Sequence, residues 1–353
     1  MGLLEDRISR IGALDEGAMQ AARLRQDKLT KPQGSLGKLE ELSIKIAGIT
    51  GKAQPRIERK VIITMAGDHG VAEAGVSLYP QEVTVQMVQN FLTGGAGINV
   101  LSRLIGARVT VVDMGVKTDI DGGKGLVREK IGRATRNMIE GPAMTARQAR
   151  DSVEAGIRIF EAELEKGLDI VGTGDMGIGN TTPSSAICAA MTGKSAADVT
   201  GRGTGVGNEQ LNHKVQVVQK ALDVNHPEPS NALDVLAKVG GFEIGGIAGV
   251  ILGAAANRVP VVIDGFISGA GAMIAAGLSP RVKDYMIASH LSVEPGHRAM
   301  LEYLGAKPLL NLDLRLGEGT GGCLGIFLCE AATRILSEMA TFEQAGVSTA
   351  EEK

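Results

Sequence analysis

The stretch that decides the fold is Leu168-Asp169-Ile170-Val171-Gly172-Thr173-Gly174-Asp175-Met176-Gly177-Ile178-Gly179-Asn180-Thr181-Thr182. It begins as a short apolar run typical of a buried strand and continues into glycines and polar residues. Thr182 followed by Pro183 is a favourable helix start, because Thr is a good N-cap and Pro suits the first helical position. The stretch therefore predicts a strand, a glycine-rich loop and a helix in succession.

Five other apolar runs alternate with longer segments whose apolar residues recur at helical spacing. Most of the runs are continuously apolar, which is typical of strands buried on both faces of a parallel sheet. This alternation predicts a doubly wound α/β fold with a mainly parallel six-stranded sheet flanked by helices. The predicted strands are Val61–Met65, Arg108–Asp113, Leu168–Val171, Val259–Asp264, Tyr285–His290 and Pro308–Leu314. The predicted helices are Gln81–Ile105, Thr145–Lys166, Asn208–Leu222, Ala232–Ala256 and Thr320–Met339.

The two ends of the chain differ from its middle. The first fifty residues contain helical patterns without a strand, and the last thirty are helical as well. We expect residues 1–55 and about 325–353 to form a small helical domain that flanks a large Rossmann-like catalytic domain of residues 56–324.

Composition excludes several classes of partner. The net charge of −3, an aromatic content of 3% and the lack of Trp argue against nucleic acid. The longest apolar stretch, Ile244–Ala256, is too short for a bilayer, so we expect no membrane association. The N-terminus has no signal-peptide pattern, and the three cysteines are widely spaced and flanked by apolar residues. We therefore expect a cytoplasmic protein.

The glycine loops predict where a ligand binds. In an open parallel sheet, ligands bind beyond the carboxyl ends of the strands. Glycine amides that lead into a helix N-terminus form an anion site, so residues 172–182 suit a monophosphate. A second glycine cluster at residues 201–208 opens the helix that carries Lys214. Lys214 either points back at the phosphate or is a solvated surface lysine.

The loop also matches the pattern GxGxxG at Gly172, Gly174 and Gly177. A dinucleotide fingerprint needs an acidic residue at the end of the next strand, and no apolar strand precedes Asp198. A nucleotide-dependent oxidoreductase is therefore only an alternative function, supported by the glycine pattern but lacking the required acid. A non-catalytic sensor of a phosphorylated ligand is a third hypothesis.

Two acids in glycine-rich loops are candidate catalytic groups. Glu318 lies between Gly317 and Gly319, and Asp175 lies in the first loop. An acid in an enclosed cleft has a raised pKa, which suits a general base, whereas a structural acid would accept backbone hydrogen bonds in its own loop. Asp68-His69-Gly70 fits a metal site, a nucleophile or a turn stabilised by Asp. The histidines lack the spacing of metal ligands, so we expect no metal: His69, His213, His226, His290 and His297.

Several motifs, taken in order between about residue 30 and residue 340, resemble those of the nicotinate-nucleotide–dimethylbenzimidazole phosphoribosyltransferase family. Their number and order make the resemblance specific. They are Lys31-Pro32-Gln33-Gly34-Ser35-Leu36-Gly37, Gly67-Asp68-His69-Gly70-Val71, Tyr79-Pro80-Gln81-Glu82-Val83-Thr84, 174–182, Gly201-Arg202-Gly203-Thr204-Gly205 and Leu316-Gly317-Glu318-Gly319-Thr320-Gly321.

The resemblance implies a homodimeric enzyme of cobalamin lower-ligand assembly that needs no cofactor. It would move the phosphoribosyl group of nicotinate mononucleotide to 5,6-dimethylbenzimidazole, with inversion at C1′, giving α-ribazole 5′-phosphate and nicotinate. The catalytic base of the family corresponds to Glu318. The family has Glu at the position of Asp175, so the shorter carboxylate would reach less far here.

The expected site comprises three groups of residues. The catalytic pair is Glu318 and Asp175. The phosphate- and ribose-binding residues are Gly174, Gly177, Ile178, Gly179, Asn180, Thr181, Gly203, Gly205, Lys214, Asp264 and Ser292. The base-binding residues are Tyr79, Pro80, Val83, Gln86, Met176, Leu316 and Gly317.

Overall fold

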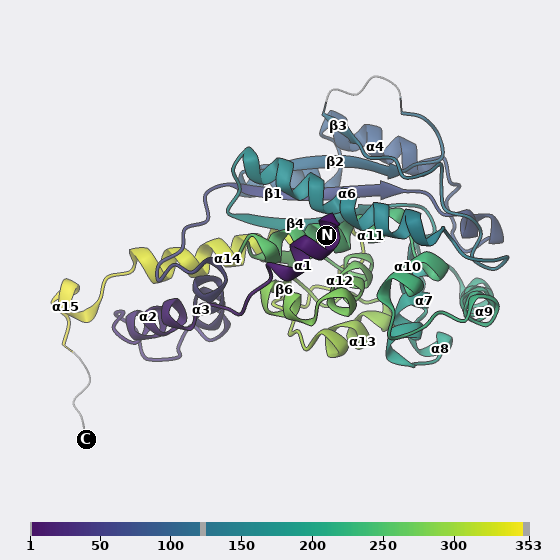
Figure 1. The fold of residues 1–353 in the computed structure, drawn as a ribbon. Helices are drawn as coiled ribbons and strands as arrows, with labels where there is room; N and C mark the ends of the chain where they lie inside the picture. The colour runs from purple at the N-terminus through teal and green to yellow at the C-terminus, as the bar shows by residue number, and fades with distance from the viewer. Residues whose placement is uncertain (1, 121–124, 349–353) are drawn as a thin grey trace.

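The computed structural model describes residues 2–120 and 125–348. Its centre is a six-stranded sheet in the order β3-β2-β1-β4-β5-β6, and all neighbouring strands run parallel (Figure 1). This order confirms the doubly wound architecture, with a topological switch point between β1 and β4. The strands are β1 Lys60–Gly67, β2 Ala107–Gly115, β3 Leu126–Arg128, β4 Ile170–Met176, β5 Val261–Ile263 and β6 Met286–Ala288.

Helices cover both faces of this sheet, and within the described ranges none of them is long and apolar enough to cross a bilayer (Figure 1). The α-helices are α1 Leu3–Ser9, α2 Glu16–Gln26, α3 Lys38–Thr50, α4 Val83–Thr93, α5 Gly97–Ile105, α6 Ala146–Glu165, α7 Thr181–Thr192, α8 Ala196–Val199, α9 Asn208–Asn225, α10 Ala232–Val239, α11 Phe242–Ala256, α12 Phe266–Leu278, α13 Pro295–Leu304, α14 Thr320–Glu338 and α15 Phe342–Ala345. Two 3-10 helices are η1 Gly70–Ala74 and η2 Pro280–Tyr285.

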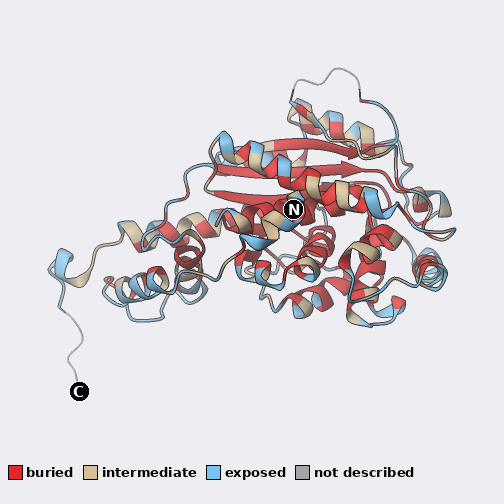
Figure 2. Cartoon of the chain, in the orientation of Figure 1, coloured by how far each residue is buried: buried red, intermediate tan, exposed pale blue. Residues whose placement is uncertain are grey.

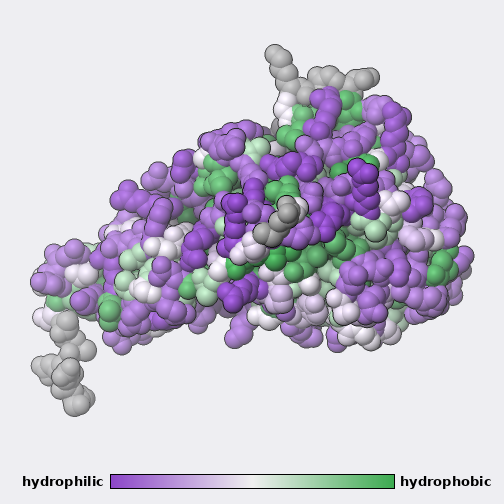
Figure 3. All heavy atoms as spheres, viewed as in Figure 1, coloured by the Kyte–Doolittle hydropathy of each residue, from purple (hydrophilic) through white to green (hydrophobic). Residues whose placement is uncertain are grey.

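The strand β1 shows why both faces are covered. Every residue of β1 is buried, and the sheet appears red throughout its centre in Figure 2. Val61, Ile63 and Met65 pack into the core shared with α6 and α11. Ile62 and Ala66 alternate with them and face the core shared with α14. Hydrophilic residues cover most of the outer face in Figure 3, as expected once the apolar runs are buried.

One predicted strand is wrong and one observed strand was missed. Residues 308–314 lie beside the end of β6 and the residues that follow it, with one parallel bridge between His290 and Leu310 and several backbone hydrogen bonds. They do not form a regular strand, and Asp313 adopts a left-handed conformation with φ 54°. The sixth strand is β3, which pairs with β2 over only three residues. β3 lies between Gly125 and Glu129, so it has no longer apolar run around it of the kind that marks the equally short β5 and β6 in the sequence.

Two predicted helices are each divided into two. The helix predicted over residues 81–105 ends at Gly94, whose φ of 84° is the left-handed conformation typical of a helix C-terminus. The helix predicted over residues 232–256 is interrupted at Gly240 and Gly241, between α10 and α11. In both cases apolar residues recur at helical spacing on both sides of the break, so the sequence pattern resembles that of one longer helix.

The ends of the chain pack in two places. The helices α2 and α3 lie beside the end of α14, where Ala22, Ala47 and Leu336 form a separate small core (Figure 1). The first helix, α1, packs instead against α6 and α11, and its Leu4 joins the large core. We therefore propose a small helical domain of α2, α3 and the end of α14, with α1 assigned to the large domain rather than to residues 1–55.

The helices α6 and α11 approach each other through glycines. A β-carbon on Gly249 would lie 2.0 Å from the carbonyl oxygen of Val153 and 2.8 Å from the α-carbon of Gly156. Both neighbours are backbone atoms, so neither can move without shifting a helix. This contact sets how closely α6 and α11 approach each other.

We predict that Gly249→Ala lowers the free energy of unfolding by about 1–3 kcal/mol, because overpacking outweighs the gain of about 1 kcal/mol in helix propensity. Chemical denaturation measures the effect. Gly141→Ala is the matched control, since nothing lies within 4 Å of a β-carbon there. Equal stabilities of the two variants would contradict the packing described above.

Candidate active site

A cavity of about 290 Å³ lies beyond the carboxyl ends of β1, β4, β5 and β6. Its volume is at the lower end of the range for small-molecule sites, about 300–1,000 Å³. Twelve of the expected residues line it: Tyr79, Asp175, Met176, Gly177, Ile178, Gly179, Asn180, Thr181, Gly203, Ser292, Leu316 and Gly317. Nine further lining residues were not expected: Val76, Ser77, Thr204, Gly265, Phe266, Ile267, His290, Glu294 and Arg315.

One end of the cavity is the N-terminus of α7. The helix begins at Thr181 with Asn180 as N-cap, which is earlier than the predicted start at Thr182-Pro183. Backbone N–H groups of Gly179 and Thr181 have no hydrogen-bond partner within residues 2–120 and 125–348. Free amides at the positive end of a helix dipole are the features of an anion site.

Lys214 lies at this anion site, although it belongs to α9. Its side chain is buried, and Nζ donates a hydrogen bond of 2.6 Å to Oγ1 of Thr181. The alternative of a solvated surface lysine is therefore wrong. Burial lowers the pKa of Lys214 to about 8, while the charge of Glu294 opposes this shift. The ammonium group therefore stays mostly protonated at pH 7 and loses its proton around pH 8.

Glu294 is a buried acid that the sequence analysis missed. It directly precedes α13, and Oε1 accepts a 2.8 Å hydrogen bond from the N–H of Gly203. A β-carbon on Gly203 would lie 3.0 Å from Nζ of Lys214 and 2.9 Å from Oγ1 of Thr181. Glu294 therefore fixes the second glycine loop against the anion site, and the Gly203 amide is already occupied by this bond.

Asp175 lies near the end of β4, beside the first glycine loop. Its Oδ2 accepts a 2.9 Å hydrogen bond from Nδ2 of Asn180. Burial, joined by the charges of Asp264, Glu243 and Glu318, raises the pKa of Asp175 well above its ordinary value. These effects favour the protonated form of Asp175, which can donate a hydrogen bond.

Glu318 is held by a helix outside its own loop. It is only 5% exposed, and Oε2 accepts a 3.0 Å hydrogen bond from the N–H of Ile98 in the first turn of α5. Burial raises the pKa of Glu318, and the amides of Ile98 and Gly97 partly offset that rise. The Glu318 side chain is therefore neither solvated nor hydrogen bonded within its own turn.

The turn that carries Glu318 is anchored by Asp264 at the end of β5. The two carboxylate oxygens of Asp264 accept hydrogen bonds from Gly319 at 3.1 Å and Gly322 at 3.0 Å. Burial raises the pKa of Asp264 to about 7. Both oxygens therefore bind backbone amides at the start of α14. Asp264 was expected to bind phosphate or ribose, but it does not line the cavity.

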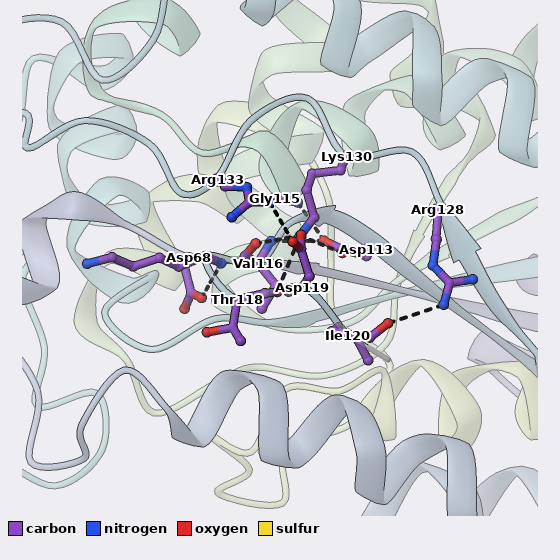
Figure 4. A network of polar contacts seen from close by, with 11 residues as sticks. Asp68, Asp113, Gly115, Val116, Thr118, Asp119, Ile120, Arg128, Lys130 and Arg133 are labelled. Atoms are coloured by element: carbon purple, nitrogen blue, oxygen red, sulfur yellow. Dashed lines mark hydrogen bonds and ion pairs between the residues drawn. The ribbon is translucent and has the colours of Figure 1, made fainter. Parts of the chain in front are cut away.

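The motif Asp68-His69-Gly70 is structural. Oδ2 of Asp68 accepts a 2.8 Å hydrogen bond from the N–H of Lys117, which joins the loops after β1 and β2 (Figure 4). In the same network Asp113 is contacted by Lys130 at 3.2 Å. His69 is buried and lies 2.7 Å from Glu243. These contacts favour the hypothesis of a stabilised turn over that of a metal or a nucleophile.

The first glycine loop is also tied to α4. The N–H of Ile178 donates a 3.1 Å hydrogen bond to Oγ1 of Thr84, so it is occupied in this structure. Ile178 was expected to bind phosphate, but its amide fixes the loop to α4 instead. Gly174 was also expected to bind phosphate. Its lack of a side chain instead allows the turn of Glu318 to pack against β4, since a β-carbon at Gly174 would lie 2.3 Å from the carbonyl oxygen of Glu318.

Four of the seven expected base-binding residues line the cavity: Tyr79, Met176, Leu316 and Gly317. Leu316 and Tyr79 are 60% and 55% exposed, which is unusual for large apolar side chains. Leu316 and the Glu318 carboxylate both approach Gly97, at 3.0 and 3.3 Å from its β-carbon position. Eight expected residues do not line the cavity itself: Pro80, Val83, Gln86, Gly174, Gly205, Lys214, Asp264 and Glu318.

Comparison with known proteins agrees with this arrangement. A model of a phosphoribosyltransferase family matches residues 11–347. The nicotinate-nucleotide–dimethylbenzimidazole phosphoribosyltransferase of Desulforudis audaxviator is 60% identical over 350 residues, 99% of each chain, and that of a Roseiflexus species is 59% identical over 348 residues, again 99% of each. The chain belongs to this family.

Solved structures support the same assignment. The crystal structure of CobT from Thermus thermophilus is 46% identical and has a TM-score of 0.91. It covers 95% of this chain and 100% of its own. The family resemblance and the fold predicted from the sequence are therefore confirmed. The GxGxxG alternative is not favoured, because Gly172 and Gly174 lie inside β4 rather than in a phosphate-binding turn.

The contacts of Glu294 generate a prediction about pH. Glu294→Gln keeps an oxygen for the Gly203 amide but removes the negative charge that raises the Lys214 pKa. The pKa of Lys214 should fall below about 8, so the ammonium is lost at a lower pH. We expect kcat/KM for the phosphorylated substrate to fall about fivefold at pH 8 and little at pH 6.5 if the pKa falls by about one unit, because the protonated fraction at pH 8 then falls from about one half to about one tenth.

The measurement is a pH profile of kcat/KM for wild type and variant. Glu302→Gln, which changes an exposed residue of α13, is the matched control. In a Lys214→Arg background, whose guanidinium stays charged, Glu294→Gln should not move the alkaline limb. An equal loss at every pH would mean that Glu294 acts only through the loop.

Proposed function

We propose that this protein transfers the phosphoribosyl group of nicotinate mononucleotide to 5,6-dimethylbenzimidazole, giving α-ribazole 5′-phosphate and nicotinate. The reaction belongs to the assembly of the lower ligand of cobalamin. One observation supports the proposal most strongly: a buried, helix-held carboxylate, Glu318, lies at the same edge of the sheet as the anion site at α7. A transfer between a phosphorylated sugar and a nitrogen base needs both features.

The phosphate is expected to bind at the start of α7. The free amides of Gly179 and Thr181 and the ammonium of Lys214 supply hydrogen-bond donors and positive charge. Binding energy from this remote group can hold C1′ in line between the leaving and the attacking nitrogens. The exposed apolar side chains of Leu316 and Tyr79 supply an apolar surface for the incoming aromatic base.

The chemistry requires one proton acceptor. The bond between C1′ and the positively charged pyridinium nitrogen breaks, and its electron pair neutralises that nitrogen, so nicotinate needs no acid to leave. One benzimidazole nitrogen attacks C1′ from the opposite face, which inverts the configuration. The other nitrogen then carries an acidic N–H, and Glu318 takes that proton. The raised pKa of Glu318 makes its carboxylate a better base.

Asp175 has a supporting role in this proposal. Its pKa is raised well above the ordinary value, which favours the protonated form that can donate a hydrogen bond. Its contact with Asn180 places it beside the phosphate loop. The acid is shorter than the family's Glu, but a hydrogen-bond donor on the ribose side of the cavity does not need to reach the acceptor base.

We predict that purified protein releases nicotinate and forms α-ribazole 5′-phosphate from the two substrates in the presence of EDTA. Glu318→Gln should lower kcat by about a hundredfold or more, the range typical of a lost general base, while substrate binding persists. Asp175→Asn should cost less, about tenfold at most, because an amide resembles a protonated acid. Product analysis by chromatography measures all three.

Glu338→Gln, at the exposed end of α14, is the control for the charge change. Unchanged turnover in Glu318→Gln would remove Glu318 from the role of base. A wild-type protein that binds nicotinate mononucleotide without turnover would favour the alternative of a non-catalytic sensor. Which base is preferred in the cell depends on small differences in apolar contact, worth about 1–3 kcal/mol per methyl group.

We also propose that the protein is a cytoplasmic homodimer. Large apolar side chains are exposed on two helices that pack together: Val100 and Leu104 on α5, at 55% and 77%, and Phe327 on α14, at 56%. A second copy of the chain would cover them. The three cysteines are free and buried, which suits a reducing compartment.

The dimer proposal predicts a mass in solution of twice 36.7 kDa by light scattering. Leu104→Lys should shift the protein toward the single-chain mass, because it would bury an unpaired charge in the interface. Val224→Lys, on the exposed side of α9, should leave the mass unchanged. A wild-type mass of 36.7 kDa at every concentration would refute the proposal.

A further inference from the structure

His290 is a cavity residue to which no function has yet been given. It follows β6 closely and lines the cavity, although only 3% of its surface is exposed. Its ring lies against two glycines: a β-carbon on Gly265 would be 3.4 Å from Nε2, and one on Gly321 would be 2.0 Å from Nδ1. Gly265 is itself part of the cavity wall. The ring is therefore held between the ends of β5 and α14.

The hydrogen bonds of Ser289 determine which ring nitrogen carries the proton. Oγ of Ser289 is 2.8 Å from the backbone carbonyl oxygen of Asp264, which can only accept, so the hydroxyl proton lies in that bond. Oγ is also 3.0 Å from Nδ1 of His290. With its only proton committed, Oγ must accept from Nδ1, so the proton of the His290 ring is on Nδ1. Nε2 is then an acceptor with a free lone pair.

The ring stays in this form at neutral pH. Burial lowers the pKa of His290 to about 4, so the imidazole is uncharged. The neighbouring imidazole of His297, whose ring centre is 6.2 Å away, accepts a 2.9 Å hydrogen bond from the N–H of Ser292 through Nδ1. Burial and the presence of His290 lower the pKa of His297 to about 3. Neither ring supplies a positive charge to a ligand phosphate.

Nε2 of His290 has no hydrogen-bond partner in the described part of the chain, and it is not sealed in the interior. A polar atom on a cavity wall requires a donor from the ligand or from water. Nicotinate mononucleotide offers few donors. Its ionised phosphate and carboxylate groups only accept, and its pyridinium nitrogen carries no proton. The two ribose hydroxyl groups are the donors that remain.

We propose that His290 binds the ribose, with Nε2 accepting a hydrogen bond from one of the two free ribose hydroxyl groups of nicotinate mononucleotide. This inference rests on the proposed function and adds a sugar-recognising residue to it. It also explains why the Ser289 hydroxyl is directed at a backbone carbonyl, since that bond sets the tautomer. Selection of a ribosyl over a deoxyribosyl donor follows from the same contact.

The test measures equilibrium binding at pH 7.5 of nicotinate mononucleotide and of its 2′-deoxy and 3′-deoxy analogues. His290→Asn keeps an N–H near the Nδ1 position for Ser289 but has no atom at the Nε2 position. We expect this variant to bind nicotinate mononucleotide about tenfold more weakly, in line with the loss of one hydrogen bond. One deoxy analogue should bind to wild type and variant equally, so that wild-type discrimination against it disappears.

His290→Gln is the second variant, because its amide oxygen reaches the Nε2 position and should restore part of the discrimination. His226→Asn, at the exposed C-terminus of α9, is the control. Equal weakening of all three ligands in His290→Asn, or no weakening, would overturn the proposal. If wild type neither binds nor consumes nicotinate mononucleotide, the proposed function fails and this inference fails with it; normal turnover with unchanged discrimination refutes His290 alone.

Discussion

The site depends on one turn that is hydrogen bonded to three neighbouring strands. Glu318 has a φ of 63°, an uncommon conformation for a residue with a side chain, which costs of order 1–3 kcal/mol. Thr64 of β1 donates to its carbonyl oxygen at 2.9 Å, and its N–H donates to the carbonyl oxygen of Asp175 at 3.2 Å. Asp264 then holds the two residues Gly319 and Gly322. The sheet thus fixes the position of the acid.

Acidic side chains are concentrated around this turn. The charges of Asp264, Glu243 and Glu318 all act on Asp175, and burial removes the water that would weaken them. A substrate whose reacting ring and sugar carry positive charge benefits from such surroundings, because fixed groups need no reorganisation as the bond breaks. Lys214 lies near the anion site, where its ammonium group supplies positive charge for the phosphate of a nucleotide.

Two kinds of local pattern in the sequence predicted the structure: apolar runs, and polar residues within glycine-rich loops. Continuous apolar runs predicted four of the strands closely, and the glycine loops placed Asp175 and Glu318 at the sheet edge. Contacts between distant segments left no local signal. Glu294 lies in an ordinary Val-Glu-Pro context, and only folding brings it to Gly203. Asp264 anchors the start of α14, and Glu318 caps α5, through contacts between residues that are far apart in the chain. The position of residues 308–314 beside β6 also depends on such distant contacts.

The cap that α5 receives from Glu318 links proton transfer to the strength of a helix end. A carboxylate at a helix N-terminus is worth about 0.3–1 kcal/mol, and up to about 2 kcal/mol when partly buried, but only while it is ionised. When Glu318 takes a proton in the proposed reaction, α5 loses that support until the proton departs to solvent. The same helix carries Leu104 on the proposed dimer face, so the proposed proton acceptor and that face contact opposite ends of one helix.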